Sequence, residues 1–146
     1  MLRMHWLLVI GVVVVALAGC GGGGGGDEGE GELSEQAQAA CTGSELSEKP
    51  NLPPSWPDMG EVTLTQQSKQ GPTDIVEGYF SGDLEAAHDD FKRELEGAGF
   101  TILFDELEEN DSEVSWEGEG RTGQVALRNE CGDNDKIYVH ITNRAE

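Results

Sequence analysis

The chain has 146 residues, of which 36% are hydrophobic, and its formal net charge is −20. This length suffices for one small domain with accessory segments. Only 9 lysines and arginines stand against 29 aspartates and glutamates. Nucleic-acid binding requires clustered basic residues, so the composition argues against a nucleic acid as partner.

The N-terminal segment is an apolar run that follows a single base. Arg3 precedes 13 nearly unbroken apolar residues, from Trp6 to Ala18. A membrane-spanning helix needs about 20 apolar residues. A secretory signal peptide has an apolar stretch of about 7–15 residues followed by small residues. The pattern therefore favours a cleaved signal peptide over residues 1–19 rather than a membrane-spanning helix.

The cleavage site has a more specific pattern. Leu17, Ala18, Gly19 and Cys20 follow the order apolar, small, small, cysteine. This order resembles the lipobox of bacterial lipoproteins. The resemblance implies that the Cys20 thiol is acylated and that the chain is cut before Cys20. It also implies an anchor in the cell membrane on the extracytoplasmic side, where several acyl chains hold a protein durably. The alternative is an ordinary signal peptide with a chance cysteine near its end.

Residues 20–32 are expected to form a tether. Gly21 to Gly26 are consecutive glycines, and residues 27–32 read DEGEGE. Glycine runs behave as flexible coil, and like charges extend a chain. A phosphate-binding glycine loop needs a preceding strand, a following helix and usually a lysine, and the sequence has none of these here. We therefore expect a spacer between the membrane and a folded domain.

Lipidation of Cys20 leaves two further cysteines, Cys41 and Cys131. Disulfides persist outside the cytoplasm. We therefore predict a Cys41–Cys131 disulfide that joins an N-terminal extension to the domain. The sequence contains no C-x-x-C pair, which argues against a redox role.

Residues 33–60 are predicted to be a proline-rich extension. Leu33 to Ala40 can form a short helix, and the prolines at 50, 53, 54 and 57 break regular structure after it. Trp56 lies among these prolines, and we expect its ring to pack onto the domain.

Residues 61–146 are predicted to be a small α+β domain. Alternation of apolar and polar residues predicts strands near 62–65, 75–80, 100–104, 114–116, 125–127 and 137–141, with a turn over 67–73. Phe100, Ile102 and Phe104 are expected to share one strand face. Asp83 can cap a helix whose apolar stripe runs from Leu84 to Ala98. The predicted order is β-β-α-β-β-β-β, with one helix on one face of an antiparallel sheet of five or six strands.

The sheet face away from the helix is the candidate binding surface. Alternation places a group of aromatic and basic residues there, namely Tyr79, Arg128, Tyr138 and His140. Two other interpretations remain open: a merely solvated face, or a face that closes against residues 33–60 through Trp56.

Other motifs give no metal or catalytic site. His88 and His140 lack a metal-ligand spacing, and His88 is expected to be a hydrogen-bonded packing residue at the edge of the helix stripe. Residues 133–135 are too short for a calcium-binding loop and are typical of a turn. No G-x-S-x-G motif occurs. We therefore predict no metal, no cofactor and no enzymatic activity.

The predicted role is a non-enzymatic, lipid-anchored binding or interaction module of the cell envelope. Its expected partner is an envelope protein or a cell-wall component. The alternative is a sensor or accessory domain for a small ligand or cation, and a hydrolase comes third. The acidity keeps a protein soluble and repels anionic lipid headgroups. A salt-rich habitat or a partner with a basic surface would favour the same composition.

Overall fold

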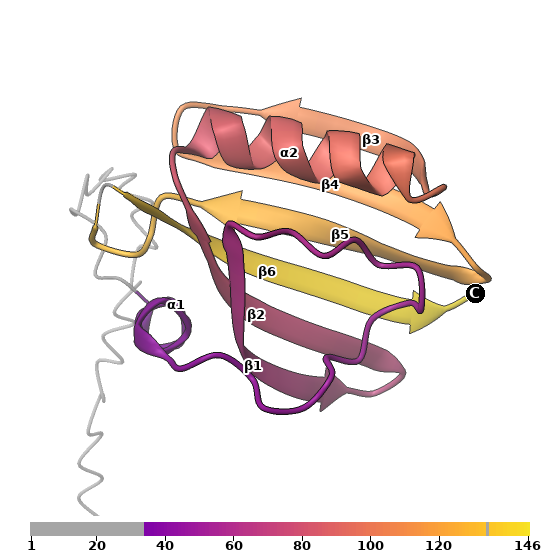
Figure 1. Cartoon of the computed structure of the whole chain (residues 1–146), viewed down its shortest axis with the longest axis horizontal. Coiled ribbons are helices and arrows are strands. Elements are labelled where there is room, and N and C mark those ends of the chain that lie inside the picture. Colours follow the sequence, from indigo (N-terminus) through magenta and orange to yellow (C-terminus); the bar gives the residue numbers. More distant parts are fainter. Residues whose placement is uncertain (1–33, 134) are drawn as a thin grey trace, which may run out of the picture.

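The computed structural model describes residues 34–133 and 135–146 (Figure 1). The predictions for the signal peptide over 1–19, for lipidation of Cys20 and for the tether over 20–32 lie outside these residues. The described elements, in chain order, are α1 (Glu35–Thr42), β1 (Val62–Gln70), β2 (Thr73–Ser81), α2 (Leu84–Gly97), β3 (Thr101–Leu107), β4 (Asp111–Gly118), β5 (Arg121–Arg128) and β6 (Lys136–Ala145). Within this part of the chain, no helix has the length and apolar character needed to cross a membrane.

The strands form one six-stranded sheet in the order β1-β2-β6-β5-β4-β3. All five neighbouring pairs are antiparallel. The chain leaves β2 through α2, which packs on one face over β3, β4 and β5, and returns by hairpins to β6 beside β2 (Figure 1). The predicted two-layer α+β fold, with one helix on an antiparallel sheet, is confirmed.

Helix α2 forms where the sequence predicts it. The Asp83 carboxylate accepts a hydrogen bond from the Ala86 backbone N–H at 2.8 Å, which satisfies one of the free donors at the helix start. Ala87, Phe91 and Leu95 are buried on one side of the helix. They pack on sheet residues that form the main core, among them Val76, Phe80, Val114, Trp116, Val125, Leu127, Val139 and Ile141.

The strands are longer than the predicted ones, and their turns are tighter. The predicted turn over 67–73 is too long: the turn consists of Gly71 and Pro72 alone, because β1 continues to Gln70 and pairs Lys69 with Asp74. Polar side chains are tolerated there because β1 is an edge strand. Between β4 and β5, the two-residue turn has positive φ at Glu119 (56°) and Gly120 (69°), as a type I′ hairpin turn requires.

A β-bulge changes the pattern of β3. Ile102 lies opposite Trp116 and Phe104 lies opposite Ser115, so one extra residue is inserted in β3 between them. A shift by one residue moves a side chain to the other face of a sheet. The expectation that Phe104 shares the face of Ile102 is therefore wrong, and Phe104 is 50% exposed.

The segment before β1 contacts both faces of the sheet. Helix α1 packs against the face opposite α2, where Ala37, Ala40 and Cys41 contact Tyr138. The predicted Cys41–Cys131 disulfide is present, with the two Cα atoms 5.5 Å apart. Residues 44–60 then pass to the α2 side, where their apolar side chains pack against the main core.

Candidate functional site

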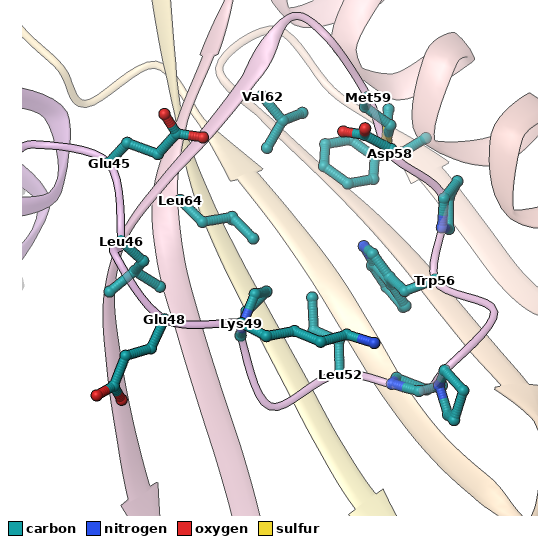
Figure 2. A pocket seen from close by; sticks show the side chains of 15 residues that line it. Glu45, Leu46, Glu48, Lys49, Leu52, Trp56, Asp58, Met59, Val62 and Leu64 are labelled. Atoms are coloured by element: carbon teal, nitrogen blue, oxygen red, sulfur yellow. The ribbon is translucent and has the colours of Figure 1, made fainter.

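A candidate site is a cavity of about 400 Å³ beside α2 (Figure 2). One wall is the segment 45–59, and the opposite wall comes from β1 and from Phe91 of α2. Its apolar lining consists of Leu46, Leu52, Trp56, Met59, Val62, Leu64 and Phe91, together with prolines 50, 53, 54 and 57. Separate segments of the chain therefore form one hollow, which has polar as well as apolar surface.

The apolar side chains around the cavity are incompletely buried. Phe91 and Met59 belong to the buried core. Leu46, Leu52, Trp56, Val62 and Leu64 pack against that core but stay only partly buried. Removing such surface from water is favourable in proportion to its area. An apolar molecule in this cavity would complete the burial of these side chains.

The proline-rich wall is held in place at several points. The Leu46 N–H donates to the Leu64 carbonyl at 2.8 Å. Asn51 donates its N–H to the Gln67 side chain at 3.3 Å, so the wall is also bonded to the outer half of β1. Together these bonds align the wall along β1.

Two further contacts fix the far side of this wall. The Ser55 N–H and hydroxyl both donate to the Glu119 carboxylate, at 3.2 and 2.8 Å. The Trp56 ring makes edge contacts with Phe100 and Trp116, with ring centroids 5.8 and 5.1 Å apart. The expectation that Trp56 packs onto the domain is confirmed. With both ends of the wall fixed, the cavity is pre-formed.

A buried polar network supports the same wall from the core. The Asn143 amide donates to the Asn51 carbonyl at 2.8 Å. Its own carbonyl oxygen accepts from Arg121 Nε at 2.6 Å, and Arg121 also contacts the Asp74 carboxylate at 3.3 Å. The Arg121 side chain can only donate, so the Asn143 oxygen must face Arg121. The Asn143 NH₂ group therefore faces Asn51 in the wall.

The rim of the cavity carries charge of both signs. Glu45, Glu48, Asp58 and Lys49 all line it and are exposed. In Figure 2, Lys49 extends across the cavity toward Trp56, whereas the Glu48 carboxylate points away from the other labelled side chains. Three carboxylates against one ammonium make the rim acidic, like the chain as a whole.

The predicted binding residues lie on the sheet face opposite the cavity. Tyr79, Tyr138 and Arg128 are cross-strand neighbours in one row, as alternation requires. The structure places Tyr138 beneath α1, where it is buried. Lys136 lies over the Tyr79 ring at 4.3 Å from its centroid, and Arg128 is exposed. Helix α1 therefore covers part of the face that the sequence leaves open.

A buried carboxylate organises this covered region. Glu77 is only 3% exposed. It accepts a short hydrogen bond from the Tyr138 hydroxyl and a 2.7 Å bond from the Gln36 amide of α1. His140 Nδ1 lies 3.2 Å from the same carboxylate. Burial raises the pKa of Tyr138, and its hydrogen bond to Glu77 raises the pKa further.

His88 belongs to a serine–histidine–aspartate arrangement that the sequence does not reveal. Its Nδ1 lies 2.7 Å from the Ser112 hydroxyl, and its Nε2 lies 3.5 Å from Asp105. A hydrogen bond from Lys92 lowers the pKa of Asp105. Ser112 is 2% exposed, so a substrate cannot reach its hydroxyl. The arrangement is structural, and the interpretation of His88 as a hydrogen-bonded packing residue is confirmed.

No group of three or more histidine, cysteine, aspartate or glutamate side chains that could hold a metal occurs in the described residues. Comparison of the chain with protein-family models, curated proteins and solved structures gives no significant match. The assignment of a function therefore depends on the geometry described above.

Proposed function

We propose that this protein is a lipid-anchored, extracytoplasmic binding protein whose cavity beside α2 takes a small apolar ligand that is not an anion. The observation that carries the proposal is the ring of partly buried apolar side chains around a pre-formed cavity. A domain of this size gains stability from burying such residues. Their partial exposure at one place is typical of a ligand site.

The dimensions of the cavity support this interpretation. Small-molecule pockets usually measure about 300–1,000 Å³ and have mostly apolar walls with a few polar groups. The cavity of about 400 Å³ lies at the lower end of this range. Its wall is stiffened by four prolines and fixed by bonds to Leu64, Glu119 and Asn143. Little conformational entropy is therefore lost when a ligand binds.

The charge of the rim sets the class of ligand. Glu45, Glu48 and Asp58 outnumber Lys49 at the cavity mouth, and the whole chain carries a net charge of −20. A summed negative potential disfavours the approach of anions. A neutral or cationic apolar molecule therefore binds better than an anionic molecule of the same shape.

The anchor rests on the lipobox-like order of residues 17–20. An acylated Cys20 followed by a glycine-rich tether keeps the binding domain near the membrane but free to reorient. Fractionation of cells tests this part: the protein should be found with membranes, and Cys20→Ala should release it. A wild-type protein found in the soluble fraction would contradict the anchor.

The cavity is tested with two fluorescent probes on a protein of residues 21–146, which carries no acyl chain and retains every described helix, strand and the disulfide. N-phenyl-1-naphthylamine is neutral, and 1-anilinonaphthalene-8-sulfonate is an anion of similar shape. We expect saturable binding of the neutral probe and at least tenfold weaker binding of the anion. Val62→Phe should fill the cavity and abolish binding.

Ile75→Phe serves as the matched control, because Ile75 is, like Val62, a partly buried β-branched strand residue, and it does not line the cavity. It should leave the affinity for the neutral probe unchanged. Equal binding by the Val62→Phe and wild-type proteins would show that the probe binds elsewhere. Tighter binding of the anionic probe would overturn the assigned ligand class.

A further inference from the structure

The two edges of the sheet differ in how they are protected. Strand β1 forms one edge, and its first half is covered by the chain before it: Leu46 donates to the Leu64 carbonyl and the Thr65 hydroxyl donates to the Ala40 carbonyl. Its second half exposes only polar side chains, including Lys69. Natural sheets use coverage and lysines in this way to prevent pairing with other strands.

Strand β3 forms the other edge and lacks these protections. Among the described residues, it has no neighbouring strand on its outer side. It contains neither lysine nor proline. The exposed large hydrophobic residues of the described chain all lie on it: Leu103 at 54%, Phe104 at 50% and Leu107 at 42%. An exposed apolar edge strand is a template for adding another strand.

The bulge in β3 concentrates this apolar surface. Phe104 lies opposite Ser115 on the face away from α2. Leu103 borders a shallow hollow on the same face, which it shares with Ser115, Thr122 and Thr142. A strand laid beside β3 would therefore meet two adjacent apolar side chains on one face.

The charges around β3 select the occupant. Glu106 lies opposite Glu113 on β4, and Glu108, Glu109 and Asp111 follow in the turn. Like charges directly opposite each other are unfavourable unless a cation comes between them. A second copy of this chain would add another −20 of net charge, so it is a poor occupant.

We propose that the β3 edge binds an extended segment of a partner protein as a further strand, and that this segment carries apolar and basic residues in succession on one and the same face. Backbone hydrogen bonds supply the pairing, Leu103 and Phe104 contact the apolar residues, and Glu106 and Glu113 contact the basic ones. This surface is independent of the cavity beside α2.

The test uses the full chain in a neutral detergent and a fluorescein-labelled nine-residue lysine–valine peptide, in which threonines alternate with two valines and then two lysines, so that the valines and lysines share one face. We expect saturable binding by fluorescence anisotropy that weakens with added salt. Hydrogen exchange should slow at the β3 amides and stay unchanged at the β1 amides. The double variant Leu103→Ser and Phe104→Ser should weaken binding at least tenfold, and it removes only exposed side chains.

Three controls make the result decisive. Ile75→Ser changes a partly buried apolar residue of β2 on the same sheet face, and it should leave the peptide affinity unchanged. A peptide with N-methylated alternate residues keeps the charge but cannot pair, and it should bind at least tenfold more weakly. A glutamate–valine peptide should not bind.

Several outcomes would overturn the proposal. Equal binding of the N-methylated peptide would show a purely electrostatic attraction. If the lysine–valine peptide does not bind at 1 mM, the β3 edge is not a binding surface for such a segment. The same follows if hydrogen exchange slows in β1 rather than in β3. A dimer of the chain that is lost in the Leu103→Ser, Phe104→Ser variant would identify a second copy as the occupant instead.

Discussion

Glu77 and Tyr138 show how a single buried carboxylate fixes the position of a helix. The Glu77 carboxylate accepts hydrogen bonds from Tyr138 on the adjacent strand β6 and from Gln36 on α1. A buried charge without such donors is strongly destabilising. The pairing joins the sheet to α1, so protonation changes at Tyr138 affect the stability of the whole N-terminal segment.

This pair predicts a loss of stability in alkaline solution. Burial, and then the bond to Glu77, raises the pKa of the Tyr138 hydroxyl in the folded state above its ordinary value of about 10. Above pH 10, the unfolded chain releases this proton while the folded chain retains it. The unfolded state then binds fewer protons, so the free energy of unfolding falls as the pH rises.

Urea unfolding of the wild-type protein between pH 9 and pH 11 measures this slope. The Tyr138→Phe variant should show a weaker pH dependence over the same range, although it is less stable at pH 8 by about 2 kcal/mol, because the buried Glu77 carboxylate loses a donor. Tyr79→Phe removes a tyrosine without this partner and serves as the control. Identical slopes for the Tyr138→Phe and wild-type proteins would contradict the linkage.

At the scale of helices and strands, the disulfide adds a covalent link to the contacts that hold α1 in place. Helix α1 has only eight residues, and isolated helices shorter than about 12 residues are marginal in water. The Cys41–Cys131 bond closes a loop over a sequence separation of 90. The chain-entropy model assigns such a loop about 4–5 kcal/mol, an amount that depends on that model.

The double variant Cys41→Ala and Cys131→Ala should therefore lower the free energy of unfolding by several kcal/mol, measured by chemical denaturation. Hydrogen exchange should accelerate first in α1, because the remaining sheet keeps its own pairing. Thr42→Ala changes an exposed residue of the same helix and should cost under 1 kcal/mol. A double variant as stable as the Thr42→Ala control would show that packing alone holds α1.

The elements differ in how far the sequence could predict them. Asp83 and the apolar stripe of α2 are local signals, and they place the helix correctly. The bulge before Phe104 depends on pairing with β4, which no local pattern encodes. The contact of His88 with Ser112 likewise joins α2 to β4, which lies further along the chain, so local sequence does not reveal it.

The sequence does not predict the cavity, for a related reason. Residues 33–60 read as an extension because prolines break helix and strand patterns. Leu46, Leu52, Trp56 and Met59 are apolar residues spaced through this proline-rich segment, which is the one sequence signal that the segment packs on the core. These residues line the cavity together with Val62 and Leu64 of β1 only because of the path that the chain takes in the folded protein, and no local sequence pattern encodes that path.

At the scale of the whole molecule, the excess of negative charge opposes the compact state. Twenty-nine acidic residues face nine basic ones, and self-repulsion of this kind destabilises a folded domain. Salt screens exposed charges, with a Debye length of about 10 Å at 0.1 M. We therefore expect the melting temperature to rise when sodium chloride increases from 20 to 500 mM, and to rise equally with potassium chloride.

Two substitutions on β3 separate this repulsion from specific ion pairs. Glu106 lies opposite Glu113, so Glu106→Gln should raise the melting temperature at 20 mM salt and reduce its salt dependence. Asp105 pairs with Lys92 at 2.8 Å, so Asp105→Asn should lower the melting temperature at low salt. Each effect is expected to be under about 1 kcal/mol, because exposed charge pairs contribute little. A melting temperature that falls with salt would show that attractive pairs outweigh the net charge.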